Sequence, residues 1–424
     1  MTLHSAYREL RSSGLVWLGD IPRHWKTVAL HYVGRLKSGE SITALQFNEN
    51  SKYPVYGGNG YRGKCDRFTH EGEYVLIGRQ GALCGNINIA RGKFFASEHA
   101  IVVNASWIFD VNWLGYQLLS MNLNQYSVSA AQPGLSAETI GRLKIVFPPL
   151  EEQKAITRFL DFKTAQIDAL IAKKEELLER LAEKRTALIS HAVTKGLDPS
   201  APMKDSKIEW ISSIPQDWKE TKVKFLGDLI LGLTYSPDDV ASYGGTLVLR
   251  SSNVQEGKIS LDDCVYVSCD IPKKVITKFD DILICSRNGS RALIGKCALL
   301  TEEASNQAFG AFMTVLRSRH AKFLYYVLNS TLFKFQSGRF LTSTINQLTT
   351  QTLGDFEIAL PPEETQAGIV SYLDKATEAI DAQCRKVQAA IDRLTEYRGA
   401  LITNAVTGKI DVRLFDAQPA ATLS

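Results

Sequence analysis

Apolar residues recur with a helical period in two long segments of this chain of 424 residues. In the first segment, residues 147–194, alternating steps of four and three select one stripe, made of Ile167, Ile171, Lys174, Leu178, Leu181, Arg185, Leu188 and Ala192. This spacing is typical of the seam of a coiled coil. Pro148 and Pro149 keep the backbone extended before the segment, and Gly196 follows it. We therefore predict one long helix here.

The same stripe returns 213 residues later. Its members there are Ile380, Cys384, Val387, Ile391, Leu394, Arg398, Leu401 and Ala405. Only Arg398 is neither apolar nor small, and it corresponds to Arg185. Two helices with one seam most simply bury it against each other, and a two-fold relation between the halves makes them antiparallel. Such helices form a rod about 60 Å long. The alternative is two unrelated amphipathic helices, each lying on its own domain.

Two short motifs also occur twice, in the same order. WLGDIPRHWK at residues 17–26 returns as WISSIPQDWK at 210–219, and FPPLEEQ from residue 147 returns as LPPEETQ from residue 360. A protein built from two copies of one module does one thing at two places. The tryptophans of the first motif are expected to anchor each copy on the end of the coiled coil; they are Trp17, Trp25, Trp210 and Trp218.

Between the repeated motifs lie two bodies, residues 27–146 and 220–359, that resemble each other far less. Both hold short β-type runs broken by glycine and followed by helical stretches, which predicts mixed α/β domains. Each has an apolar run followed by arginine and then glycine, around Arg79 in the first body and Arg287 in the second. A closely repeated scaffold that carries two divergent domains is consistent with two domains that recognise different targets.

Composition narrows the class of protein. Apolar residues make up 45% and charged residues 22% of the chain, as in a soluble globular protein. The N-terminus lacks the apolar core of a signal peptide and no window suits a membrane span, so we expect a cytoplasmic protein without a membrane partner. Seven cysteines without a CxxC pair predict reduced thiols. A zinc site built from Cys264, Cys269, Cys285 and Cys297 would match no common spacing.

The net charge of +4 is too small to establish a polyanionic partner. Its distribution says more. Residues 1–146 hold 15 lysines and arginines against 10 acidic residues, whereas residues 147–198 hold 9 of each kind. The positive excess therefore lies in the globular part of the first half.

These features together resemble the specificity (S) subunit of a type I restriction-modification system. The resemblance covers nearly the whole chain and rests on the W-L-G-x-I-P-x-x-W lead-in before each body and the P-P-x-x-E/T-Q motif that opens each long helix, although the second lead-in has Ile211-Ser212-Ser213 where the first has Leu18-Gly19-Asp20. It implies an α+β fold with two mixed α/β target recognition domains, separated by a long antiparallel two-helix coiled coil in a pseudo-two-fold internal repeat. The second helix differs in carrying Thr365 where Glu152 stands in the first.

The resemblance implies five segments. They are a lead-in with the first DNA target recognition domain (1–146), a first spacer helix (147–196), a second lead-in with the second domain (197–359), a second spacer helix (360–411) and a C-terminal tail (412–424). Each recognition domain is expected to bind one half of a bipartite, asymmetric site in double-stranded DNA. The helices are expected to set the spacing between the half-sites and to dock two methyltransferase subunits.

The resemblance also implies that this chain is not an enzyme. Methyl transfer and ATP-dependent cleavage are expected in partner subunits, namely the methyltransferase (modification) and motor-nuclease (restriction) subunits. S-adenosylmethionine, ATP and Mg²⁺ are expected to bind there, and neither a cofactor nor a catalytic residue is expected in this chain.

One alternative is a metal-dependent DNA endonuclease. Asp238, Glu256 and Lys258 fit the loose PD-(x)n-ExK pattern, in which carboxylates hold a metal and the lysine assists hydrolysis. Chance matches to this pattern are common, and the first body has no counterpart. A methyltransferase is disfavoured because the chain has neither an FxGxG-type loop nor an N/D-P-P-F/Y motif. A helical scaffold without a nucleic-acid role would leave the two bodies unexplained.

DNA recognition requires cations for phosphates and forked donors or amides for base edges. The candidates in the first body are Tyr61, Arg62, Lys64, Arg79 and Gln80. The candidates in the second body are Arg287, Asn288, Ser290, Arg291 and Lys296. Arginine can fork onto guanine and glutamine onto adenine, which makes Arg79 and Gln80 the first choice for base contact. The alternative is that an Arg-Gly turn between strands is only a solvated hairpin.

Overall fold

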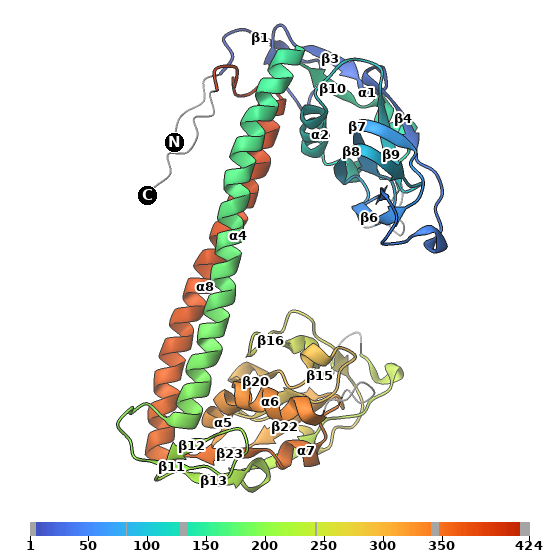
Figure 1. The fold of residues 1–424 in the computed structure, drawn as a ribbon. Helices are drawn as coiled ribbons and strands as arrows, with labels where there is room; N and C mark the ends of the chain where they lie inside the picture. Colours follow the sequence, from blue (N-terminus) through green and yellow to red (C-terminus); the bar gives the residue numbers. More distant parts are fainter. Residues whose placement is uncertain (1–5, 82, 128–133, 242–243, 341–346, 416–424) are drawn as a thin grey trace. The chain divides into compact units, whose positions relative to one another are not determined.

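The computed structural model describes residues 6–81, 83–127, 134–241, 244–340 and 347–415 (Figure 1). The chain divides into two compact units, which are Met1–Glu175 with Gln388–Ser424, and Glu176–Val387. Both unit boundaries fall inside the two long helices. Each unit therefore combines one body with one half of each helix.

The long helices are α4 (Leu150–Lys195) and α8 (Glu363–Val406). Each begins three residues later than its motif, because the Pro-Pro pair lies before the first turn. The seam prediction is confirmed, since all eight seam positions of each helix are buried or half-buried. Most of the other positions in the middle of each helix are exposed and polar.

The two helices pack antiparallel in both units. In the first unit, Ile156 and Phe159 near the start of α4 share a buried cluster with Ile402 near the end of α8. In the second unit, Ile189 near the end of α4 shares a cluster with Ile369 near the start of α8. The fold is thus the expected pair of mixed domains on an antiparallel coiled coil.

Each of the two seam arginines has an ionic partner on the opposite helix. Arg398 Nε donates to Asp168 Oδ1 at 2.8 Å, and Arg185 Nε lies 3.4 Å from Asp381 Oδ1. The offset of 213 residues that relates the two arginines also relates the two aspartates. One pair therefore maps onto the other when the halves are exchanged, as a pseudo-two-fold axis requires.

The glutamine that closes each helix-start motif explains why the motif is repeated. Gln153 and Gln366 are buried, and their Nε2 atoms donate to the carbonyls of Pro148 and Pro361 at 2.9 and 2.8 Å. These carbonyls precede the helix and have no partner within its first turn, so the side chain satisfies a backbone group that burial would otherwise leave unpaired.

The two lead-ins also form the same structure. A two-stranded ladder joins β1 (Leu10–Ser12) to β2 (Asp20–Pro22), and an equivalent ladder joins β11 (Met203–Asp205) to β12 (Ser213–Pro215). Both ladders cover the end of a long helix. Lys195 Nζ donates to the carbonyl of Ser213 at 2.7 Å, and Lys409 Nζ donates to that of Leu18 at 3.0 Å.

The expected anchoring role is confirmed for two of the tryptophans. Trp25 and Trp218 are fully buried, and each lies against the positive-φ glycine that follows a long helix, Gly408 or Gly196. The prediction was wrong for Trp17, which is 57% exposed. Its counterpart Trp210 is half-buried and packs against the cluster that holds Ile189 of α4.

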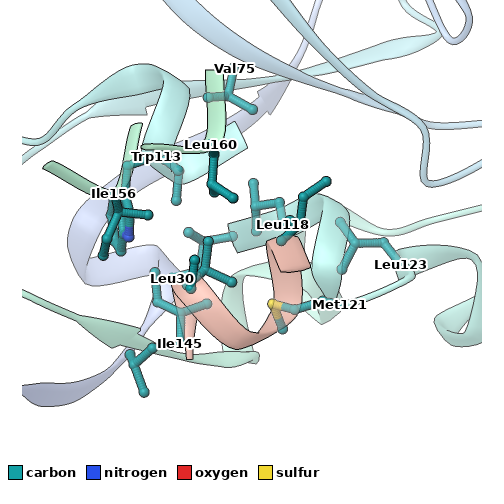
Figure 2. Packing of buried hydrophobic residues seen from close by; sticks show 14 of the residues in the cluster. Leu30, Val75, Trp113, Leu118, Met121, Leu123, Ile145, Ile156 and Leu160 are labelled. Carbon is teal, nitrogen blue, oxygen red and sulfur yellow. The ribbon is translucent and has the colours of Figure 1, made fainter. Parts of the chain in front are cut away.

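The first body is built on a six-stranded sheet in the order β4-β9-β7-β8-β5-β6. The strands are β4 (Gly34–Ser38), β5 (Tyr53–Gly57), β6 (Gly60–Cys65), β7 (His70–Gly78), β8 (Ile87–Ala96) and β9 (Ala100–Ala105). The helices are α1 (Leu30–Val33), α2 (Val111–Ser120) and α3 (Ala137–Arg142). A separate ladder pairs β3 (Lys26–Ala29) with β10 (Lys144–Phe147). Figure 2 shows Trp113 and Leu118 of α2 in one core with Ile156 and Leu160 of α4, which ties this body to the coiled coil.

The second body has a four-stranded sheet in the order β14-β22-β19-β20, with smaller ladders beside it. The strands are β14 (Asp228–Leu231), β15 (Thr246–Leu249), β16 (Val254–Gln255), β17 (Lys258–Ile259), β18 (Tyr266–Val267), β19 (Ile282–Cys285), β20 (Cys297–Leu299), β21 (Ala308–Phe309) and β22 (Met313–Arg317). The helices are α5 (Ala321–Leu328), α6 (Thr331–Phe340) and α7 (Thr350–Gly354). A ladder of β13 (Lys219–Lys222) with β23 (Glu357–Leu360) closes the body.

The two bodies share more than the sequence indicated. The order β14-β22-β19-β20 repeats β4-β9-β7-β8, and a parallel pair follows in each body, β5 with β8 in the first and β15 with β21 in the second. Gly39 and Gly232 also correspond. A Cβ atom on either residue would lie 2.1 Å from a backbone carbonyl oxygen of the neighbouring segment. The divergence of the bodies therefore affects loops and side chains on a common backbone plan.

The cysteines are all free thiols. Burial raises the pKa of the Cys297 thiol to about 12, which keeps it protonated and unreactive at neutral pH. None of the helices in the described ranges is long and apolar enough to cross a membrane.

Candidate nucleic-acid interface

Three loops of the first body converge at one end of its sheet. They are residues 57–60 after β5, residues 78–81 after β7, and residues 97–99 before β9. A Cβ atom on Gly58 would lie 3.2 Å from the carbonyl oxygen of His99 and 3.4 Å from that of Gln80. The glycines of the first loop thus allow the three backbones to touch, and we call these segments the reading loops of the first body.

Arg79 and Gln80 are held in the reading loops by their backbone. The Arg79 amide donates to the carbonyl of His99 at 2.8 Å, and the Arg79 carbonyl accepts from the amide of Leu135 at 2.8 Å. The Arg79 side chain is half-buried, whereas that of Gln80 is exposed. A hydrogen bond of 3.1 Å joins Gln80 Oε1 to His99 Nδ1. The amide is therefore oriented before any ligand binds.

The other candidates of the first body lie on the neighbouring edge strand, β6. Tyr61 is 59% exposed, Lys64 is exposed, and the Arg62 guanidinium lies 5.7 Å from the centre of the Phe47 ring. A Cβ atom on Gly57 would lie 2.3 Å from Arg62 Cδ, so the arginine stem runs along the first reading loop. All five predicted residues of this body are thus gathered on β6 and the adjoining loops.

The second body has three equivalent reading loops. They are residues 250–253 after β15, residues 285–288 after β19, and residues 310–312 before β22. Asn288 Nδ2 donates to Ser251 Oγ at 3.1 Å, which joins two of the loops. The exposed Arg287 guanidinium lies 5.1 Å from the centre of the Phe312 ring, which is itself 56% exposed. Beside Phe312 lies a hollow of about 710 Å³.

Backbone hydrogen bonds correct the match between the two arginine loops. The Ser286 amide donates to the carbonyl of Phe312, and the Ser286 carbonyl accepts from Leu348, as Arg79 does with His99 and Leu135. Arg79 therefore corresponds to Ser286, and Gln80 corresponds to Arg287. Isolated β-bridges agree with this match. Gln80 pairs with Gly134, and Arg287 pairs with Gln347, which lies 213 residues after Gly134 in the sequence. The two arginines do not occupy equivalent positions.

Three candidates of the second body lie outside the reading loops. Lys296 is half-buried, and its Nζ donates to the carbonyl of Val254 at 2.7 Å, a contact that holds β16. Arg291 donates to the carbonyl of Gly338 at 3.3 Å, and Ser290 is exposed next to it. Below the loop, burial raises the pKa of the Cys285 thiol and the ammonium of Lys296 partly opposes this rise.

Sequence reasoning missed three residues of the reading loops. His99 and Phe312 support Gln80 and Arg287, and Arg250 lies in the first loop of the second body, where its guanidinium donates to Asp263 Oδ2 at 2.9 Å. A single aromatic residue before a strand carries no signal by itself. Arg250 follows an apolar run as Arg79 does, but it lacks the nearby glycine that completed the pattern around Arg79.

The structure gives no support to the nuclease alternative. Lys258 Nζ lies 3.3 Å from Asp381 on α8, so it binds a helix carboxylate. Glu256 occupies the turn between β16 and β17 with φ of 50°. No group of three or more histidine, cysteine or acidic residues that could hold a metal ion occurs in the part of the chain that the structure describes.

Known proteins resemble this chain over different lengths. The type I restriction enzyme EcoprrI specificity subunit of Escherichia coli is 41% identical over 140 residues, which are 32% of this chain and 35% of that protein. The type I restriction enzyme MjaVIII specificity subunit of Methanocaldococcus jannaschii is 24% identical over 414 residues, which are 93% of this chain and 94% of that protein. The chain thus matches about a third of the EcoprrI subunit and nearly all of the MjaVIII subunit.

Comparison of folds gives a consistent result. A chain from a solved type I restriction-modification system, described for its complex assembly and conformational transition, aligns with a TM-score of 0.68. The alignment covers 92% of this chain and 99% of the solved chain. Because the two sequences are only 17% identical, this similarity concerns the fold alone. The family model of the type I restriction modification DNA specificity domain matches twice, at residues 22–180 and 215–391. The two matches coincide with the two repeats and cover most of the chain, which therefore belongs to this family.

Proposed function

We propose that this chain is the non-catalytic DNA-recognition subunit of a type I restriction-modification complex, and that each body binds one half of a bipartite, asymmetric site in double-stranded DNA. The observation that carries the proposal is the contrast between frame and loops. The lead-ins, helix starts and seam ion pairs repeat, whereas the equivalent reading loops present Gln80 with His99 in one body and Arg287 with Phe312 in the other. Two different half-sites follow from two different sets of loops.

We propose that the candidates predicted from the sequence contact DNA, and we rank them by their position relative to the reading loops. Gln80, Arg287 and Asn288 lie in the reading loops, and Tyr61, Arg62 and Lys64 border them. Replacing Arg79 by alanine is expected to weaken or relax recognition of the first half-site. Ser290 and Arg291 are exposed and suit phosphate contacts. Lys296 has a backbone partner within the body, so it ranks last.

The helices are proposed to set the gap between half-sites and to dock two methyltransferase subunits. Lys173, Glu176 and Arg180 on α4 are exposed, as are Lys386 and Arg393 on α8. Two copies of one partner need the same residues twice, and the lysines and arginines recur at an offset of 213. We retain the five segments expected from sequence, although the two compact units divide the helices between them.

Catalysis is assigned to partner subunits. Methyltransferase and motor-nuclease subunits would bind S-adenosylmethionine, ATP and Mg²⁺, and this chain would bind no cofactor. We further propose a cytoplasmic location, where the DNA and these partners occur together.

Methylome sequencing tests the proposal. A host that carries this chain with its methyltransferase partner is expected to show methylation at a split sequence whose two specific halves differ and flank a non-specific gap. The matched control is the same host with the methyltransferase partner alone, in which the site should be absent. Methylation at a single continuous palindrome would contradict the proposal.

A further inference from the structure

We infer that Gln80 and Arg287 occupy one shared base-reading position, and that it selects adenine in one half-site and guanine in the other. The inference rests on the proposed function and adds the identity of one base pair in each half-site. It starts from the backbone hydrogen bonds that make the two residues equivalent, and not from their side chains.

The equivalence holds on both sides of the position. Before it, Gly78 and Cys285 correspond, because Gly78 donates to Asn86 and accepts from Gly85, while Cys285 donates to Lys296 and accepts from Gly295. At the position itself, Gln80 and Arg287 form isolated bridges to Gly134 and Gln347. The Arg287 amide also donates to the carbonyl of Phe312, a bond that Gln80 lacks, and the matching bridges place both residues at the same position of the backbone.

Each reader has its own supporting residue at a second equivalent position. His99 and Phe312 both end the turn before the next strand, since Ala100 and Met313 donate to the carbonyls of Ser97 and Gly310 respectively. His99 binds the amide oxygen of Gln80, and Phe312 lies beneath the guanidinium of Arg287. The supporting residue therefore differs together with the side chain that it supports. Gln80 has a ring that forms a hydrogen bond, and Arg287 has a ring on which it stacks.

The supported groups keep the atoms that read bases. Gln80 Nε2 and the guanidinium of Arg287 have no hydrogen-bond partner among the described residues, and both side chains are exposed. Gln80 Oε1 has two lone pairs and uses one of them on His99. A glutamine amide can therefore accept from adenine N6 and donate to N7, and an arginine can donate to guanine O6 and N7.

Reciprocal exchange tests the inference. The variants are Gln80→Arg with His99→Phe, and Arg287→Gln with Phe312→His, each produced with the methyltransferase partner and examined by methylome sequencing. The first is expected to change one A·T pair to G·C in the first half-site only, and the second to change one G·C pair to A·T in the second half-site only. The control variants, Gln166→Arg on α4 and Arg319→Gln at an exposed position of the second body, make the same chemical changes away from the reading loops and the other DNA-contact candidates, and should leave the site unchanged.

The unaltered half-site serves as the folding control, because each variant changes one body. Should an exchange variant give no methylation, Gln80→Ala and Arg287→Ala decide. Each should relax one base pair, and the assembled complex should lose roughly 5- to 150-fold in discrimination at that pair. An unchanged split site in both the exchange and alanine variants overturns the inference and leaves the proposed function intact. A wild-type site that is not split overturns the proposed function itself.

Discussion

At the residue scale, two glycines fix the geometry of both sheets. Gly39 and Gly232 pass so close to a neighbouring segment that a methyl group would overlap a carbonyl oxygen. Replacing either by alanine is expected to lower the free energy of unfolding by about 1–3 kcal/mol, because the backbone must move to make room. Chemical denaturation of the full chain measures this change.

Gly399 on α8 provides the matched control. Apart from its chain neighbours and the backbone of its own helix, no atom of the described residues lies within 4 Å of where its Cβ would stand. Alanine there should stabilise the helix by about 0.5–1 kcal/mol, since it removes backbone freedom from the unfolded chain. Equal effects at Gly39 and Gly399 would contradict the steric explanation.

At this scale the sequence predicted Gln80 and Arg287 as DNA contacts but did not reveal that their positions correspond. Gln80 and Arg287 were both candidates, yet aligning the loops on their arginines placed Arg79 opposite Arg287. The true relation depends on amides that bond to His99 and Phe312, and any residue type can make those bonds. Side-chain identity therefore could not reveal it.

At the scale of elements, the coiled coil was predictable and the sheets were not. A seam is a local period, so all sixteen positions could be read directly from the chain and are buried or half-buried. The sheet order pairs segments far apart in sequence, and β21 holds only Ala308–Phe309. Strands this short have no alternating pattern of their own.

Lengthening both helices tests their role as a spacer. One heptad inserted at equivalent positions of α4 and α8 preserves the seam and adds about 10 Å. If the helices set the gap, methylome sequencing should find it longer by about three base pairs, at 3.4 Å per pair. A heptad in α4 alone shifts the seam out of register and should abolish methylation. An unchanged gap in the double insertion would refute the spacer role.

At the scale of the whole molecule, the repeat predicts how bodies can be exchanged. The ladder of β3 with β10 corresponds to that of β13 with β23. Residues 30–143 can therefore replace residues 223–356 without altering either ladder. Such a chain carries two copies of the first body on a pseudo-two-fold frame, and it should direct methylation to a split site with two identical halves in inverted orientation.

Circular dichroism and assembly with the methyltransferase partner establish whether the exchanged chain folds. Retention of the original asymmetric site by a folded chain would show that the second body does not choose its half-site. In the matched control, residues 223–356 replace residues 30–143, so that the chain carries two copies of the second body. This chain should direct methylation to a split site made of two copies of the second half-site.

The backbone origin of the reading position has a consequence for how such proteins diversify. Gln80 and Arg287 have exposed side chains, and each lies on a loop whose shape is maintained by hydrogen bonds between backbone groups. A substitution there is expected to alter the preferred base with little effect on folding, since exposed positions contribute little to stability. Selection can therefore explore new target sequences by substituting the reader and then its supporting residue, and no intermediate in that search need be an unstable protein.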